Sequence, residues 1–105
     1  MNVKTLKVGG ITYKVEEVKD LHLMDGEGNK SDFHGLIYHD SATIQLEQDQ
    51  SEDVKKATLI HEALHAILTQ SGHENHDESV ITALGYGLLR FIRDNKALIR
   101  LLERE

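Results

Sequence analysis

The sequence predicts an α+β protein, with a small, mostly antiparallel N-terminal β-sheet packed against a C-terminal helical half. In the first half, apolar and polar residues alternate along short segments, which is typical of strands with one buried face. In the second half, apolar residues recur every three or four positions, the spacing of a helix face. With 105 residues, the chain is expected to form one domain, residues 1–105, around a single core.

The sheet is predicted to begin with a hairpin. Residues 3–8 and Ile11–Val18 flank the Gly-Gly pair at 9–10, and two glycines between alternating segments favour a tight turn. Residues 25–29 are acidic and glycine-rich. However, Gly28 stands where a calcium-binding loop needs an acidic ligand, so an ordinary turn is expected there. Further strands are predicted at residues 21–24, 33–38 and 43–47.

The second half is predicted to contain three helices. Ser51 is a favourable N-cap, and Glu52 and Asp53 suit a first turn because the helix dipole is positive at that end. Glycine and Asn-Asp pairs supply the stops, since the chain contains no proline. The predicted helices run from Ser51 to Gly72, from residues 75–78 to Asp94-Asn95, and from residue 97 to residue 102.

Composition excludes several classes of protein. The formal net charge is −6, and the basic residues near the C-terminus are interspersed with acids, so no nucleic-acid partner is expected. No segment resembles a signal peptide or approaches the roughly 20 apolar residues of a membrane span. The absence of cysteine fits a reducing compartment and excludes thiolate ligands. We therefore expect a cytoplasmic protein with no membrane partner.

The most informative segment is His61-Glu62-Ala63-Leu64-His65. Residues four apart on a helix share one face, so the imidazoles of His61 and His65 can converge on one metal ion. Zinc lowers the pKa of a water molecule beside it toward ~7. Glu62 flanks the pair, where it can accept a proton from that water without ligating the metal. We therefore expect one Zn²⁺ ion, with His61 and His65 as ligands and Glu62 as the catalytic base.

The same residues have alternative interpretations. Five-residue patterns occur by chance, and the two imidazoles can instead be hydrogen-bonded core residues of a metal-free interaction module. The surroundings favour a metal, because residues 57–68 are apolar apart from Thr58 and the motif itself. A helix that is apolar nearly all round is buried. Polar groups inside it are costly unless they are bonded to a partner, and a metal supplies one.

A catalytic zinc site needs a third protein ligand. The metzincin pattern fails, because other residues occupy the positions of its glycine and third histidine. Glu78 stands at the head of the apolar stripe of the second helix, so packing of that stripe on the first helix directs its carboxylate to the His pair. Two alternatives stay open: ligation by His76 or Asp77, and a capping role for Glu78 together with Asn75.

Residues 58–67, TLIHEALHAI, resemble the active-site helix of zincin metallopeptidases. A small sheet, a motif helix and a later helix bearing a Glu are similar, more specifically, to the minimal gluzincins. Residues 78–84 and 87–95 resemble small phage and prophage proteins of this type. The similarity covers nearly the whole chain and is specific from residue 58 to residue 95.

This resemblance implies a minimal zincin-like fold and a cytoplasmic zinc peptidase. It implies His61, His65 and Glu78 as metal ligands, and Glu62 as the catalytic base. Gluzincins often carry an Asp four residues after the ligand Glu, where it supports the first His, but this chain has Thr82 there. Support for the ligands must then come from another group, such as a backbone carbonyl.

In zincins, an edge strand beside the motif helix pairs with extended substrate. Thr43–Glu47, the last strand before that helix, is the natural candidate, since main-chain pairing binds peptides with little sequence preference. The sequence fits an ordinary sheet strand there equally well. The remaining polar residues carry less weight. His22, His34 and His39 are expected to be solvated or hydrogen-bonded, His73 and His76 could form a second weak metal site, and Tyr38 and Tyr86 could pack or stabilise an oxyanion.

Two functions from different classes fit these features. The first is a zinc-dependent peptidase acting on a peptide or protein substrate. The second is a non-catalytic regulatory or protein-binding domain that zinc stabilises. Glu62 favours the enzyme, because a purely structural site does not need a carboxylate that is not a ligand, whereas a closed site with four protein ligands would favour the binding domain. Substrate identity, latency and oligomeric state are not determined by the sequence.

Overall fold

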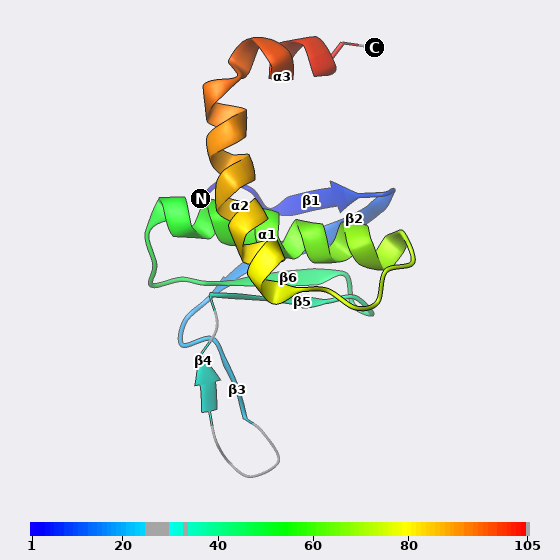
Figure 1. Ribbon diagram of the computed structural model, residues 1–105. Coiled ribbons are helices and arrows are strands. Elements are labelled where there is room, and N and C mark those ends of the chain that lie inside the picture. The colour runs from blue at the N-terminus through cyan, green and yellow to red at the C-terminus, as the bar shows by residue number, and fades with distance from the viewer. Residues whose placement is uncertain (25–29, 33, 105) are drawn as a thin grey trace.

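The computed structural model describes residues 1–24, 30–32 and 34–104 and has the predicted α+β architecture (Figure 1). The turn predicted at residues 25–29 and the predicted strand residue Phe33 lie outside the described residues. The strands are β1 (Thr5–Val8), β2 (Ile11–Val18), β3 (His22–Met24), β4 (Lys30–Asp32), β5 (Gly35–Tyr38) and β6 (Thr43–Glu47). The helices are α1 (Glu52–Gln70), α2 (Glu78–Asp94) and α3 (Lys96–Leu102).

The main sheet has the strand order β1-β2-β6-β5 and is mixed. The pairs β1–β2 and β5–β6 are antiparallel, but β2 and β6 are parallel, with Val15 opposite Ile44. A parallel pair needs a crossover connection, and here the crossover contains the separate β3–β4 pair and β5. The sheet is therefore not antiparallel throughout, because alternation within strands does not specify which strands become neighbours.

This strand order corrects the predicted edge strand. Thr43–Glu47 is β6, and it pairs with β2 on one side and β5 on the other, so its main chain is not free to receive a peptide. The prediction was wrong because the order of elements in the sequence does not determine which strand lies at the edge of the sheet. Both edge strands of the main sheet contact α1 in the described part of the chain, and β5 does so more extensively than β1.

The first hairpin is confirmed. Gly9 and Gly10 connect β1 to β2 with φ angles of 56° and 86°. Two successive positive φ angles define the turn type that matches the twist of a β-hairpin, and glycine adopts them at low cost. β4 is not predicted by the sequence, because residues 30–32 contain no apolar side chain.

The core lies between the main sheet and α1. Alternate side chains of β2 and β6 point into it, as the period-two pattern predicts. The sequence suggests that helix α1 is buried nearly all round. In the structure one side of α1 is open to solvent, since Ile67 is 47% exposed. The sheet and α2 contact other faces of the helix, whose exposed residues also include Lys56, Thr69 and Gln70. The buried core cluster comprises Val8, Tyr13, Val15, Ile44, Leu46 and Ala66.

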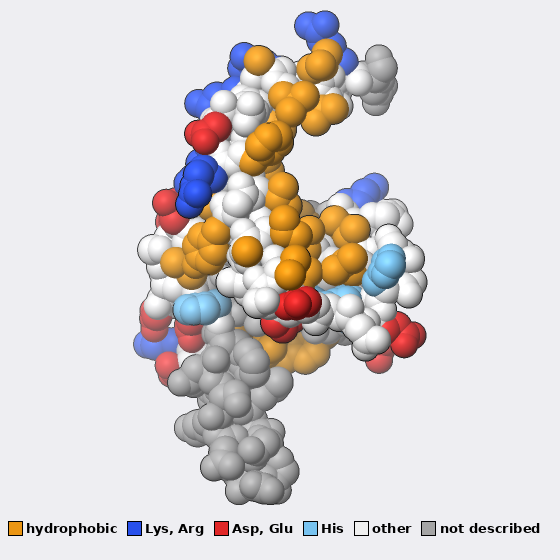
Figure 2. All heavy atoms as spheres, in the orientation of Figure 1, with side chains coloured by type: hydrophobic (Ala, Val, Ile, Leu, Met, Phe, Trp, Pro, Cys, Tyr) orange, Lys and Arg blue, Asp and Glu red, His pale blue; other side chains and the backbone are white. Residues whose placement is uncertain are grey.

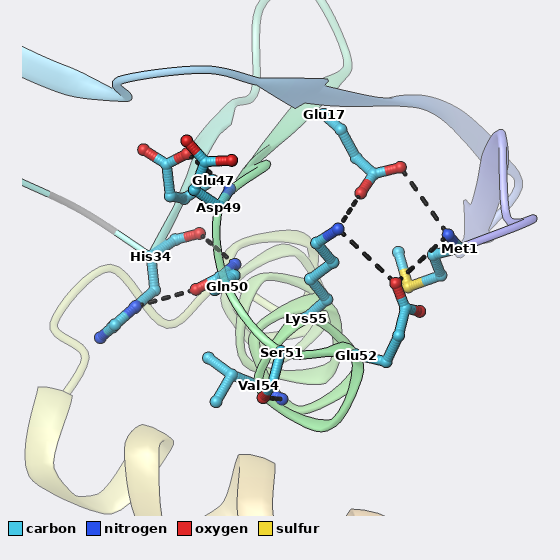
Figure 3. A network of polar contacts seen from close by, with 10 residues as sticks. All are labelled: Met1, Glu17, His34, Glu47, Asp49, Gln50, Ser51, Glu52, Val54 and Lys55. Atoms are coloured by element: carbon cyan, nitrogen blue, oxygen red, sulfur yellow. Dashed lines mark hydrogen bonds and ion pairs between the residues drawn. The ribbon is translucent and has the colours of Figure 1, made fainter.

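Polar contacts fix the start of α1 against the sheet (Figure 3). Ser51 is the N-cap, as predicted, and its hydroxyl accepts a hydrogen bond of 3.2 Å from the Val54 N–H. One turn later, the buried Lys55 places its Nζ 2.6 Å from Oε1 of Glu17 on β2 and 3.6 Å from Oε1 of Glu52. The hydrogen bond from Lys55 lowers the pKa of Glu17 and raises the pKa of Lys55.

Helix α2 packs across α1 and then extends away from the sheet, and α3 turns off its far end (Figure 1). Within the described residues, α3 contacts only α2 and buries no residue. Apolar side chains line both helices on the face shown in Figure 2. None of the helices in the described part of the chain is long and apolar enough to cross a membrane. The exposed large apolar residues of α2 and α3 are Val80, Leu84, Tyr86, Phe91, Ile92, Leu98, Leu101 and Leu102.

The Lys55–Glu17 contact predicts a pH-dependent contribution to stability. Because the pKa of Glu17 in the fold lies below its usual 4.5, the contact stabilises the folded state above that pH. The contribution is lost as the pH falls through the lowered pKa. We expect Glu17→Gln to have a lower Tm than wild type at pH 7. The difference in Tm should shrink below pH 4.5. Thermal unfolding followed by circular dichroism measures both values.

The neighbouring Glu16→Gln is a matched control. Glu16 pairs with Lys14, whose side chain is 71% exposed, and exposed ion pairs contribute little to stability. We expect its Tm to stay close to that of wild type. If the Tm fell by the same amount in both variants at pH 7, the contact between Lys55 and Glu17 would not stabilise α1 on the sheet.

Candidate metal centre

Helix α1 presents both histidines of the motif on the face that meets α2. The rings of His61 and His65 have centroids 4.9 Å apart, and their Nε2 atoms are 3.2 Å apart. The two side chains are mostly covered, with exposures of 20% and 12%. Burial lowers the pKa of His65, which favours the neutral imidazole that a metal ion requires.

Glu78 joins this pair from the first turn of α2. One carboxylate oxygen, Oε2, lies 3.2 Å from Nε2 of His61, and the other, Oε1, lies 2.7 Å from Nε2 of His65. The side chain of Glu78 is 66% exposed. The packing of α2 on α1 accounts for this position, because the buried Ile81 and Gly85 lie one and two turns further along the same helix.

The start of α2 gives Asp77 and Glu78, two of the candidate third ligands, different contacts. Asp77 is the N-cap, and its Oδ1 accepts hydrogen bonds from the backbone N–H groups of Ser79 and Val80. The Ser79 hydroxyl, which donates to the same oxygen, and then these backbone groups lower the pKa of Asp77 and direct its carboxylate to its own helix. Since Asp77 is the N-cap, the predicted capping role of Glu78 with Asn75 is wrong. Glu78 is the first residue of the helix and faces the His pair.

The chemistry and spacing of these donors suit zinc. The two Nε2 atoms and the Glu78 carboxylate lie within 4.8 Å of one another. Ligands bound to a tetrahedral zinc ion are separated by about 3.3 Å, close to the 3.2 Å seen from His61 to each partner. Among residues 1–24, 30–32 and 34–104, the group contains only these three residues. A four-coordinate ion would therefore keep one position for a non-protein ligand.

Glu62 lies beside the group on the buried side of α1, with an exposure of 5%. Burial, and to a lesser extent the charge of Glu78, raise the pKa of Glu62 to about 7. A carboxyl group with this pKa can accept and return a proton near neutral pH, which is what general acid–base catalysis needs.

A cleft of about 530 Å³ adjoins the group. One wall is β5, the edge strand, and the others are α1 and the first half of α2. Glu62 and all three members of the metal group line the cleft. Its other lining residues are His34, Gly35, Leu36, Ile37, His39, Ala57, Thr58, Thr82 and Tyr86.

The structure thus brings together His61, Glu62, His65 and Glu78, the four residues that the sequence predicts for the site. Sequence reasoning missed other residues beside it. His34 and His39 flank β5 and line the cleft, and no local pattern indicates this because it depends on the position of β5 beside α1. The side chain of His22 is outside the described part, and Tyr38 is 41% exposed and does not line the cleft.

In the described part of the chain, no group of three or more possible metal ligands includes His73 or His76, which could have formed a second weak metal site. Instead, Nε2 of His76 faces the backbone carbonyl of His73, and Nδ1 of His76 lies 2.7 Å from Nδ1 of His65. His76 therefore contacts the outer edge of a metal-group histidine and is not itself in the group.

Comparisons with protein families, curated proteins and solved structures found no match to the chain.

The close approach of α2 to α1 at Gly85 predicts a test of this geometry. A Cβ atom on Gly85 would lie 3.0 Å from the Ala57 carbonyl oxygen and 3.6 Å from Cβ of His61. Gly85→Ala therefore requires α1 and α2 to separate by a few tenths of an ångström at this point, and Glu78 lies on the same helix. Gly87→Ala is the matched control on the same helix, because a Cβ there meets no atom within 4 Å. Both changes gain up to about 1 kcal/mol in helix propensity.

We expect Gly87→Ala to be at least as stable as wild type and to keep its zinc affinity. Gly85→Ala should be about 1–3 kcal/mol less stable than Gly87→Ala, because overpacking offsets its propensity gain. It should also bind zinc more weakly, because the Glu78 ligand is displaced. Urea denaturation and chelator competition measure the two quantities, and equal values for both variants would contradict this packing.

Proposed function

We propose that this protein is a zinc-dependent peptidase of the minimal gluzincin type. The observation that carries the proposal is the convergence of His61, His65 and Glu78 from two helices, with the buried carboxyl group of Glu62 beside them. The order of the motif and the later Glu along the chain supports the gluzincin assignment. The donors are nitrogen and oxygen atoms, the set that catalytic zinc uses when cysteine is absent.

Zinc, when bound, supplies a Lewis acid that polarises a carbonyl group and lowers the pKa of water toward ~7. The residues of the chain have separate roles around it. His61, His65 and Glu78 hold the ion, and Glu62 accepts the proton of the attacking water. Glu62 then passes that proton to the leaving amine, and its pKa of about 7 suits both transfers at neutral pH.

A peptide substrate is supported by the position of β5 at the edge of the sheet. The His34 carbonyl accepts a hydrogen bond of 2.8 Å from the Glu47 N–H, and hydrogen-bonding direction alternates along a strand. The backbone groups of Gly35 and Ile37 therefore point away from β6, toward the open edge. An extended peptide can pair with these groups and lie across the cleft beside Glu62.

Tyr86 is a candidate for stabilising negative charge on the reacting carbonyl. It lines the cleft on α2, and 46% of the residue is exposed, so its phenol is not locked in the core. A phenolic O–H is a donor of the kind that stabilises an oxyanion.

A second function, a zinc-stabilised protein-binding domain, is favoured by a different observation. Most of the exposed large apolar residues in the described chain lie on α2 and α3, and α3 packs on nothing but α2. Contiguous exposed apolar surface is typical of protein interaction sites. Such a surface does not need Glu62, so the two functions make different predictions for that residue.

The peptidase proposal predicts distinct effects for ligand and base variants. Purified without a His tag, wild type should hold about one zinc per chain. Glu62→Gln should keep the zinc and lose roughly 10²- to 10⁴-fold in peptide cleavage. His61→Ala and Glu78→Ala should lose most of the zinc and the activity with it. Elemental analysis measures the metal, and cleavage of a peptide library followed by mass spectrometry measures the activity.

Glu74→Gln is the control for Glu62→Gln. It makes the same change of charge at an exposed residue between α1 and α2 that does not line the cleft, so zinc content and cleavage should match those of wild type. Wild type that stays zinc-free after reconstitution would contradict the metal site. Zinc-loaded wild type that cleaves no better than Glu62→Gln would favour the binding domain.

A further inference from the structure

The ring of His65 has two partners on opposite edges. Its Nε2 faces His61 and Glu78 in the metal group. Its Nδ1 faces His76, which lies in the loop between α1 and α2, and the two Nδ1 atoms are 2.7 Å apart. The two rings are within 24° of parallel, with centroids 4.9 Å apart. The Nδ1–Nδ1 distance is that of a hydrogen bond, so one of these nitrogens carries a proton and the other accepts it.

The direction of this hydrogen bond follows from the other edge of His76. Its Nε2 lies 2.5 Å from the backbone carbonyl oxygen of His73. A carbonyl oxygen can only accept, so Nε2 of His76 carries a hydrogen. In a neutral imidazole the other nitrogen is then an acceptor. Nδ1 of His76 therefore accepts the hydrogen bond, and Nδ1 of His65 donates it.

We propose that His76 is a positioning residue for the metal site, and that the chain from the His73 carbonyl through His76 fixes the tautomer and orientation of His65. With its proton on Nδ1, His65 presents the lone pair of Nε2 to His61 and Glu78. This is the form that a metal ligand must have, and a hydrogen bond to the second nitrogen of the ring selects it. The inference deepens the proposed function and rests on zinc binding at this group.

The contact between His65 and Glu78 supports the assignment. Oε1 of Glu78 is 2.7 Å from Nε2 of His65. If His65 is neutral and protonated on Nδ1, both of these atoms are acceptors, so a bound cation or a proton on Glu78 must lie between them.

The loop that carries His76 is anchored at both ends. At one end, the His73 N–H donates to the Leu68 carbonyl at 2.9 Å, so the carbonyl that ends the hydrogen-bond chain is attached to the last turns of α1. At the other end, Asp77 caps α2 directly after His76. These anchors hold the His76 ring against His65. They supply ligand support in a chain that has Thr82 where gluzincins often have a supporting Asp.

The test compares zinc affinity, measured by competition with a chromophoric chelator, in variants of His76. His76→Ala should weaken zinc binding about 10- to 100-fold, the usual effect of losing a partner of a ligand histidine. His76→Asn should recover most of the affinity, because its amide oxygen occupies the place of Nδ1 as an acceptor. His76→Gln should not, because its oxygen lies one bond further along the side chain. His73→Ala should bind like wild type, since it keeps the backbone carbonyl.

The comparison of Asn with Gln makes the test independent of folding losses in the alanine variant. If His76→Ala bound zinc as tightly as wild type, or if Asn and Gln behaved alike, the positioning role would be overturned while the metal site itself stood. Wild type that binds no zinc would overturn the proposed function, and this inference with it. Circular dichroism of each variant confirms that the affinities refer to folded protein.

Discussion

The close packing of α2 on α1 is the constraint on which the site depends. The two histidines of α1 are one turn apart on a single helix, so local structure is enough to place them together. Glu78 is thirteen residues after His65, and only the approach of the second helix brings it within 3.2 Å of both imidazoles. Gly85 permits that approach, because its missing side chain lets α2 contact the backbone of α1 at Ala57.

The same packing sets the electrostatics of the cleft. Glu62 lies between the sheet and the second helix, where burial and the nearby Glu78 raise its pKa to about 7. A buried carboxylate costs free energy of folding when it ionises, so Glu62 does not stabilise the fold in its charged form. Contacts elsewhere stabilise the helix that carries it, namely the Ser51 cap and the link from Lys55 to Glu17.

Much of the fold could be predicted from the sequence because it is encoded locally. The alternation of Ile11–Val18, the Gly-Gly turn before it and the Ser51 cap each depend on residues close together in the chain. The histidine pair of the motif belongs to the same class, since four-residue spacing on a helix determines one shared face. Local sequence separates Glu78 from Asp77 less clearly as the third metal ligand, because both residues are acidic and adjacent.

The remaining features depend on contacts between distant segments. Periodicity does not reveal that β2 and β6 are parallel neighbours, or that β5 takes the edge beside α1. The places of His34 and His39 in the cleft follow from that strand order and were missed with it. The contact of His76 with His65 depends on the path of a loop, which residue spacing does not specify.

In the proposed site, His61, His65 and Glu78 hold one zinc ion and leave its fourth position open. X-ray absorption spectroscopy at the zinc edge, on protein loaded with one equivalent of zinc, is the decisive test of this site. We expect a four-coordinate ion with two imidazole nitrogens and two oxygens at about 2.0–2.2 Å. Glu78→Ala, treated in the same way, should retain little of the ion. A spectrum with three or more imidazoles, or full zinc retention by Glu78→Ala, would contradict this site.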